Sequence, residues 1–245
     1  MVITQPMKTD KTQRPDVRAL GTFPRPDSGT VDESYSPPPL AINVVKHPLV
    51  QNALSLLRNK HTSTKQFRTY SNQLLALLTI EAVRTLPTRE ETVETPADSA
   101  KVSVLDKPVV FLSLTRHGLG LAHGIAEFVP GMSVGSINID RGRDGKSPEP
   151  RVHLVNAPML KDARVIVFDP IVGAGYSASC ALHAVRSSGA SDLSLLSFLI
   201  SSPGLNRIQM AIPSLTVWTA AVDPELDTKH GPMPGMGNFA ERLYG

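Results

Sequence analysis

The hydrophobic pattern divides the chain into a polar beginning, a helical stretch and a long region where apolar runs alternate with helical segments. Residues 1–40 show almost no apolar periodicity and are rich in proline, aspartate, serine and threonine. Such a segment cannot bury enough apolar surface to offset the entropy that it would lose on ordering. We therefore predict a disordered, proline-rich arm over residues 1–40 and a folded domain over residues 41–245.

The first part of the predicted domain is mostly helical. Residues 41–45 read as a short strand, and His47-Pro48 opens a helix whose apolar residues recur at helical spacing. Residues 62–64 offer an N-cap for a longer helix that reaches about residue 86 and ends at a proline. Residues 88–107 are polar, and only a piece around residues 92–95 is predicted to be extended.

From residue 109 onward the pattern changes to short apolar runs, each followed by a helical segment. Strands are predicted at residues 109–114, 134–139, 151–155, 165–168, 193–200 and 216–222, and helices at residues 121–128, 178–186 and 203–211. This alternation indicates an α/β fold in which a mostly parallel sheet is flanked by helices on both faces.

The charge and the amino-acid composition limit the kinds of molecule that the protein is expected to bind. The 245 residues carry a formal net charge of +3 and few aromatic side chains, and no basic block stands out, so a nucleic-acid partner is not expected. The single cysteine, Cys180, cannot form a disulfide within the chain and fits a reducing compartment. No apolar run approaches membrane-spanning length, and the N-terminus lacks a signal peptide's apolar core. We therefore expect a soluble, cytoplasmic protein with no membrane partner.

The strongest chemical signal lies at residues 169–177. An apolar run ends at Asp169, turns through a short loop that contains glycines, and enters the predicted helix at 178–186. Free N–H groups and the helix dipole favour a phosphate at such a helix start. Asp169 would stand at the carboxyl end of a strand, where open α/β sheets bind ligands. The alternative is an ordinary strand-to-helix connection.

Three further side chains are candidates at the same edge of the sheet. Arg116 and Arg141 each follow an apolar strand, and two guanidinium groups beside a phosphate loop suggest a polyphosphorylated ligand. The alternative is that each arginine is a solvated loop charge. His117 could act as an acid or base, although a lone loop histidine is more often surface decoration. The histidines show no metal-ligand spacing, so no zinc site is predicted.

The C-terminal segment, residues 230–245, contains closely spaced glycine and proline residues. A bare, rigid backbone of this kind can approach a flat ligand and offer it N–H and C=O groups. A structural turn is the alternative.

Taken in order, these motifs resemble the uracil phosphoribosyltransferase family over roughly residues 46–245. The matching motifs are His47-Pro-Leu-Val-Gln51, residues 62–68, Glu94-Thr-Pro96, Arg116 with Gly118-Leu-Gly120, Asp140-Arg141, Phe168-Asp-Pro170, Thr219-Ala-Ala-Val-Asp223, Pro234-Gly-Met-Gly237 and Glu241-Arg-Leu-Tyr-Gly245. The resemblance implies a type I phosphoribosyltransferase fold that commonly assembles into dimers or larger homo-oligomers. It also implies a pentosyltransferase of pyrimidine salvage, which joins uracil to phosphoribosyl pyrophosphate with the help of Mg²⁺ and gives UMP and pyrophosphate.

The resemblance also assigns roles by position. Arg116, Arg141 and Asp169 would be the catalytic residues: the two arginines hold the pyrophosphate, and Asp169 bonds the ribose hydroxyls. The residues that would bind phosphoribosyl pyrophosphate are Arg116, Arg141, Asp169, Pro170, Ile171, Val172, Gly173, Ala174, Gly175, Tyr176, Ser177 and Asn238. The base would be bound by Pro232, Gly237, Asn238 and Phe239. No residue is assigned as a metal ligand.

Several residues depart from the family pattern, and all of them fall at the predicted ligand edge. Ala174 stands in place of a threonine, Tyr176 in place of a glycine, His117 in place of an alanine and Asn238 in place of an acid. The segment around Pro232 is one residue shorter than in the family. Three functions follow as alternatives: a uracil phosphoribosyltransferase, an enzyme of the same fold with another substrate, and a non-catalytic nucleotide-binding or regulatory protein.

Overall fold

The computed structural model describes residues 41–140, 151–155 and 159–245, so the predicted arm over residues 1–40 lies outside it. Its centre is an eight-stranded sheet in which the order is β1-β10-β9-β7-β4-β5-β6, with β8 paired to β9. The strands are β1 Ala41–Val44, β4 Val109–Ser113, β5 Ser133–Asp140, β6 Arg151–Val155, β7 Arg164–Phe168, β8 Ile171–Val172, β9 Asp192–Ser201 and β10 Thr216–Asp223. All neighbours pair in parallel except β5 and β6, which confirms the predicted mostly parallel sheet.

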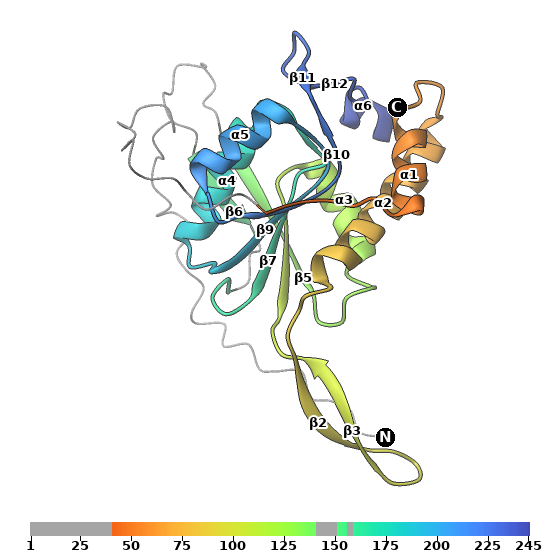
Figure 1. Cartoon of the computed structure of the whole chain (residues 1–245), viewed down its shortest axis with the longest axis vertical. Helices are drawn as coiled ribbons and strands as arrows, with labels where there is room; N and C mark the ends of the chain where they lie inside the picture. The colour runs from red at the N-terminus through yellow and green to blue at the C-terminus, as the bar shows by residue number, and fades with distance from the viewer. Residues whose placement is uncertain (1–40, 141–150, 156–158) are drawn as a thin grey trace.

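Helices cover both faces of this sheet (Figure 1). One face carries α4 Tyr176–Ser187 and α5 Ser202–Ala211, and the other carries α1 Pro48–Arg58, α2 Thr64–Val83, α3 Arg116–Ile125 and α6 Phe239–Tyr244. Alternate residues of each central strand serve the two faces: Val110 and Leu112 of β4 pack with α4 and α5, whereas Val109 and Phe111 pack with the other helices. Burial on both faces explains why these strands read as continuous apolar runs.

Two helices show how side chains set the helix starts. Ser63 caps α2 in a reciprocal capping box with Gln66, as the predicted N-cap at residues 62–64 requires. Thr115 caps α3, because its Oγ1 accepts a hydrogen bond from the Gly118 N–H at 3.0 Å. The helix predicted at residues 121–128 therefore begins five residues earlier, at Arg116.

The polar stretch after α2 forms an antiparallel hairpin of β2 Thr88–Glu94 and β3 Ser99–Leu105, which projects from the body of the molecule (Figure 1). The prediction of an extended piece at residues 92–95 was too short, because the side chains of β2 are mostly polar and exposed and none of β3 is fully buried. After β10, the short strands β11 Glu225–Leu226 and β12 Pro232–Met233 pair with each other. None of the helices in the described ranges combines the length and apolarity that crossing a membrane requires.

Candidate functional site

The strand register brings two of the predicted side chains to one edge of the sheet. Ser113, the last residue of β4, lies opposite Phe168, the last residue of β7, and the Leu114 N–H donates to the Phe168 carbonyl at 2.8 Å. Arg116 and Asp169 therefore follow neighbouring parallel strands at their carboxyl ends. Arg116 is exposed and is the first residue of α3.

The two other predicted residues of this edge are Arg141 and His117. Arg141 lies outside the described residues. His117 is half-buried, and its ring centroid lies 5.5 Å from that of Tyr244 in α6, with the rings tilted by 48°. The guanidinium carbon of Arg68 lies 6.0 Å from the same tyrosine ring. The imidazole is thus packed against the C-terminal helix.

Asp169 is a buried carboxyl group at the head of residues 169–177, a segment called here the β7–α4 loop. Only 8% of the residue is exposed, and this burial raises the pKa of its carboxyl group to about 7, while a hydrogen bond from the Ile171 backbone N–H opposes the rise. The protonated form of this carboxyl group is therefore much more populated near neutral pH than that of an exposed aspartate. A hydroxyl group or a cation that approaches it would favour the ionised form.

The next residues of the loop belong to the sheet. Pro170 accepts hydrogen bonds through its carbonyl from the Phe198 N–H at 3.1 Å and the Leu199 N–H at 3.3 Å. Ile171 and Val172 pair with β9, and the Val172 side chain is buried in the core. This piece therefore anchors the loop to the sheet, and the Val172 side chain belongs to the core.

Gly173 and Gly175 allow very close backbone packing. A Cβ added to Gly173 would lie 2.0 Å from the His230 carbonyl oxygen, so no larger residue fits without a backbone shift. Gly175, with φ of 79°, caps α4 in the left-handed conformation, and an added Cβ would lie 2.7 Å from the Gly204 carbonyl oxygen. The loop is thus enclosed between α5 and the C-terminal segment.

The side chain of Tyr176 lies against α5. It begins α4, is 48% exposed, and its ring centroid lies 3.5 Å from the guanidinium carbon of Arg207. Arg207 also donates from Nε to the Ala174 carbonyl at 3.0 Å. Ser177 is the second residue of α4. The large ring of Tyr176 is therefore accommodated by a partner on α5.

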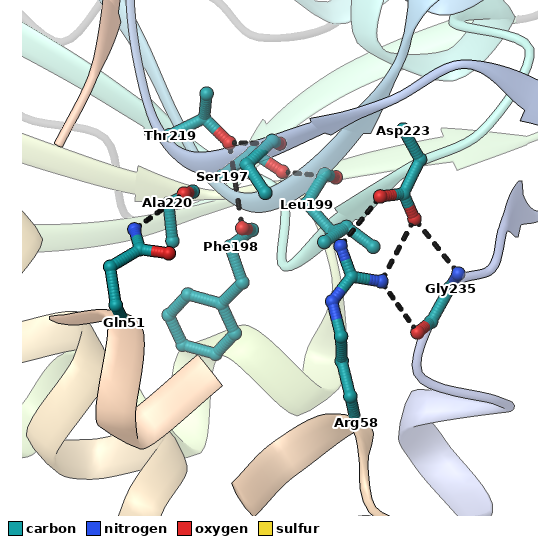
Figure 2. Close-up of polar contacts among 10 residues, drawn as sticks. Gln51, Arg58, Ser197, Phe198, Leu199, Thr219, Ala220, Asp223 and Gly235 are labelled. Atoms are coloured by element: carbon teal, nitrogen blue, oxygen red, sulfur yellow. Dashed lines mark hydrogen bonds and ion pairs between the residues drawn. The ribbon is translucent and has the colours of Figure 1, made fainter. Parts of the chain in front are cut away.

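Gly235 of the C-terminal segment is attached to the end of β10 by hydrogen bonds to a buried ion pair (Figure 2). Arg58, the last residue of α1, donates from Nη1 and Nη2 to the two carboxylate oxygens of Asp223 at 3.0 and 2.5 Å. The same carboxylate accepts the Gly235 N–H at 2.8 Å, and Arg58 Nη1 also donates to the Gly235 carbonyl at 2.8 Å. Only 4% of the Asp223 side chain is exposed. Both polar groups of the Gly235 backbone are thus used within the fold.

A second arginine holds the following turn. Arg242 donates to the Met236 carbonyl at 2.8 Å, to the Asn59 carbonyl at 2.6 Å and to the Leu57 carbonyl. Its guanidinium carbon lies 4.4 Å from the ring centroid of Phe67. Partial burial lowers the pKa of this arginine from its usual value, yet it remains a cation. Arg242 therefore connects the C-terminal segment to the end of α1.

The predicted base-binding residues are placed unequally. Pro232 is buried in β12, and Phe239 is buried against Phe67, with ring centroids 5.4 Å apart. Asn238 caps α6: its Oδ1 accepts the Ala240 N–H at 3.1 Å, and its Nδ2 donates to a Glu241 carboxylate oxygen at 2.8 Å. These three side chains already have structural partners.

Gly237 differs from its neighbours, because its N–H and C=O have no hydrogen-bond partner within the described part of the chain. Its φ of 77° lies in the left-handed region that favours glycine. Among the predicted base-binding residues, Gly237 can thus present both a backbone donor and a backbone acceptor to a flat ligand.

Sequence reasoning assigned no role to Arg58, Asp223 and Arg242. Arg58 and Asp223 are 165 positions apart, so no local pattern pairs them. The sequence signal that could have marked Asp223 is its position as an acid at the end of an apolar run. Among the described residues no three histidine, cysteine, aspartate or glutamate side chains gather as a metal cluster.

Comparison with known proteins identifies a family, curated relatives and a solved structure that the chain is similar to. Residues 44–245 match the sequence profile of the family described as uracil phosphoribosyltransferase. The uracil phosphoribosyltransferase of Thermosipho melanesiensis is 34% identical over 207 residues, which cover 84% of this chain and 99% of the relative. That of Rhodococcus jostii is 35% identical over 206 residues, covering 83% and 98%. A solved protein structure from Aquifex aeolicus is similar with a TM-score of 0.74 and 25% identity, over 83% of this chain and 97% of that one.

Proposed function

Because the chain belongs to the uracil phosphoribosyltransferase family, we propose that it joins N1 of uracil to C1 of phosphoribosyl pyrophosphate and releases UMP and pyrophosphate. The observation that carries this proposal is the buried Asp169 at the head of the glycine-lined β7–α4 loop, beside Arg116 on the neighbouring strand end. These are the elements that a phosphorylated ribose requires: a carboxylate for its hydroxyl groups, backbone N–H groups for its phosphate and a cation for the leaving group.

The reaction is a matter of charge placement. The bond from C1 to the pyrophosphate oxygen breaks, and the oxygen keeps the electron pair. N1 of uracil forms the new bond to C1, and the N1 proton is released to solvent. Positive charge develops on the ribose while this happens. An ionised Asp169 that accepts hydrogen bonds from the ribose hydroxyls would stabilise that charge, and the Arg116 side chain would stabilise the departing pyrophosphate. Arg141, outside the described residues, is proposed for the same role.

The 5′-phosphate would lie at the start of α4, against residues 173–177. Gly175 brings the backbone close, and the first N–H groups of α4 have no acceptor within their own helix. Pro170, Ile171 and Val172 would support this loop through the sheet. The departures at Ala174 and Tyr176 leave these backbone donors in place.

Uracil would be recognised mainly by backbone. Asp223, Arg58 and Arg242 occupy the polar groups of Gly235 and the Met236 carbonyl, so Gly237 would offer the remaining donor and acceptor to the pyrimidine edge. Such a site would bind uracil through complementary hydrogen bonds and would discriminate against a base whose edge cannot pair with them. Pro232, Asn238 and Phe239 would shape this turn from within the fold.

The described residues suit an Mg²⁺ ion that arrives with the substrate. Mg²⁺ in nucleotide sites keeps several waters and uses one or two carboxylates together with substrate oxygens. Asp169 is the buried carboxylate at this loop, whereas the Asn238 amide caps α6. Asp169 would be the protein group nearest to such an ion, which would neutralise pyrophosphate charge when bound. We further propose a cytoplasmic homo-oligomer, on the basis of the family resemblance and the single cysteine.

The proposal is tested by incubating the full chain with labelled uracil, phosphoribosyl pyrophosphate and Mg²⁺ and measuring UMP and pyrophosphate. We expect both products in equal amounts, and loss of the activity in the Asp169→Asn, Arg116→Ala double variant. Failure to form UMP while UMP and phosphoribosyl pyrophosphate still bind would contradict the proposed reaction.

A further inference from the structure

One face of α5 lies along the β7–α4 loop. Ser201, which caps α5, donates from Oγ to the Gly173 carbonyl at 2.8 Å. Three residues later, a Cβ added to Gly204 would lie 2.1 Å from the same carbonyl oxygen. Three residues later again, Arg207 donates from Nε to the Ala174 carbonyl at 3.0 Å. Because residues three apart share a helix face, α5 meets the loop as one continuous surface.

These carbonyl contacts determine the direction of the neighbouring N–H groups. A trans peptide is planar, so its N–H points opposite to its C=O. With the carbonyls of Gly173 and Ala174 bonded to α5, the N–H groups of Ala174 and Gly175 are directed away from α5. Within the described residues neither N–H has an acceptor. They therefore add to the N–H groups at the start of α4, and successive N–H groups of this kind form an anion site.

Tyr176 keeps Arg207 in the orientation that this contact requires. The guanidinium carbon lies 3.5 Å from the ring centroid, which is a stacking distance, while Nε of the same group reaches the Ala174 carbonyl. The planar guanidinium can stack and donate at the same time, which an ammonium group cannot do. The two loop residues that depart from the family, Ala174 and Tyr176, are thus both in contact with Arg207.

We propose that Arg207 is a positioning residue for a phosphate monoester at the β7–α4 loop. It orients the peptide between Ala174 and Gly175 so that the N–H faces the phosphate, and Tyr176 holds its guanidinium plane. This arrangement stands in for the threonine hydroxyl that the loop lacks at position 174. The inference rests on the proposed function in one respect, that the phosphate is the 5′-phosphate of a ribosyl group.

The test compares phosphorylated and unphosphorylated ligands on the full chain. Calorimetry measures the affinities for UMP, uridine and ribose 5-phosphate in the wild type and in Arg207→Met, which keeps an unbranched stem without the donor. We expect affinity for UMP and ribose 5-phosphate to fall about tenfold while the affinity for uridine is unchanged. The KM for phosphoribosyl pyrophosphate rises by a similar factor, and kcat changes less.

Three variants separate positioning from general stability. Arg186→Met is the matched control, because Arg186 lies in the last turn of α4 and bonds the Ser191 carbonyl and Ser214 Oγ instead of the loop. It should leave the preference for UMP over uridine unchanged. Tyr176→Ala removes the ring that stacks on Arg207 and should weaken UMP binding in the same direction as Arg207→Met. Arg207→Lys keeps the charge but not the planar donor, so it should remain impaired.

The possible outcomes separate the two proposals. An Arg207→Met variant with a lower melting temperature but an unchanged preference for UMP overturns the positioning role, and full recovery in Arg207→Lys overturns it as well. A wild type that makes no UMP from uracil, yet loses its phosphate preference on Arg207→Met, supports the positioning role and contradicts the proposed function. A wild type that makes UMP while the variant keeps its preference supports the proposed function and contradicts the positioning role. A wild type that binds no phosphate ester contradicts both.

Discussion

The β7–α4 loop and the C-terminal segment both bring backbone to the carboxyl edge of the sheet, but the protein holds them by different means. The glycines of the loop are held by close packing: Gly173 packs where no Cβ fits beside the His230 carbonyl, and Gly175 packs against Gly204. Ser201 and Arg207 of α5 add hydrogen bonds to the loop carbonyls. The C-terminal segment is held by charge, through the Arg58–Asp223 pair and through Arg242.

The difference shows two ways of fixing a backbone at a binding edge. Close steric packing tolerates no added atom, but it does not depend on salt or on a partner's ionisation. A buried ion pair depends on both partners, because the loss of one leaves an uncompensated charge. The steric solution suits a loop that binds an anion, since it leaves the N–H groups available. The ion pair occupies both backbone polar groups of Gly235. The base would therefore have to bind other backbone groups of the C-terminal segment, such as those of Gly237.

The largest effect is expected when the ion pair that holds the C-terminal segment is broken. Asp223→Ala should lower the free energy of unfolding by about 3 kcal/mol, because Arg58 and the Gly235 N–H lose their acceptor in a nearly buried site. The figure is taken at the low end since a quarter of the Arg58 side chain is exposed. Urea denaturation measures the change. Glu90→Ala, which breaks the exposed Lys101–Glu90 pair, is the control and should cost less than about 1 kcal/mol. Equal costs for the two variants would show that charge does not hold this segment.

The close packing of the β7–α4 loop is tested by adding one methyl group at Gly173. Gly173→Ala would place its Cβ 2.0 Å from the His230 carbonyl oxygen, and we expect a loss of about 2 kcal/mol in the free energy of unfolding together with weaker UMP binding. Gly124→Ala is the matched control, since nothing lies within 4 Å of its Cβ in α3, and it should stabilise the helix by up to about 1 kcal/mol. Thermal denaturation with and without UMP measures both. An unchanged Gly173→Ala protein would contradict the close packing.

Asp169 gives the site a pH dependence. Burial raises the pKa of its carboxyl group to about 7, and the ionised form is the one that accepts hydrogen bonds from ribose hydroxyls. In the wild type kcat/KM should therefore rise as the pH increases through about 7. Asp169→Asn should lose this rise and be about 10- to 100-fold less active at pH 8. A rise that persists in the variant would assign the titration to another group.

The same titration has the opposite effect on folding. The folded pKa of Asp169 lies above the value of 3.8 for an unperturbed aspartate, so the folded protein binds more protons between these values. The stability that the neutral carboxyl group contributes is fully present below pH 3.8 and is lost as the pH rises through about 7. The gain in melting temperature from Asp169→Asn should therefore grow between pH 4 and pH 7. A gain that is constant with pH would contradict the raised pKa.

The smallest effect separates two roles for Asn238. Its side chain caps α6, so Asn238→Ala should cost about 1 kcal/mol, while Asn238→Asp, which also caps well, should cost little. Calorimetric melting measures the cost. A variant that keeps its stability but loses UMP binding would show that the side chain serves the ligand more than the helix.

The sequence predicted the central sheet well, because strands buried on both faces appear as uninterrupted apolar runs. It predicted only a short piece of the β2–β3 hairpin for the opposite reason: Arg89, Glu90, Glu91 and Lys101 lie in strands with no fully buried side chain. The start of α3 was placed too late, since Gly118 and Gly120 weaken the helical pattern and the cap at Thr115 was not recognised.

The place of the candidate residues in the fold was predictable where one continuous stretch supplies them, as with Asp169 and residues 173–177 between β7 and α4. It was not predictable where distant residues meet. Arg58 and Asp223 are 165 positions apart, and Arg207 is 33 positions from the Ala174 carbonyl that it bonds. Local patterns also do not distinguish a residue that meets a ligand from one that caps a helix, as Asn238 shows.

The pairing of β1 with β10 has a consequence for the order in which the molecule forms. Ala41 lies opposite Thr216, so this edge of the sheet joins segments from the two ends of the described chain. Closing so long a loop is entropically costly and is rewarded only after β10 is in the sheet, which makes such contacts slow to form. Because α1 and Arg58 follow β1 directly, the ion pair with Asp223 should form with this late step. We expect pulsed hydrogen exchange during refolding to show the Val45 N–H, which bonds the Thr219 carbonyl, protected after the amides of β4 and β7.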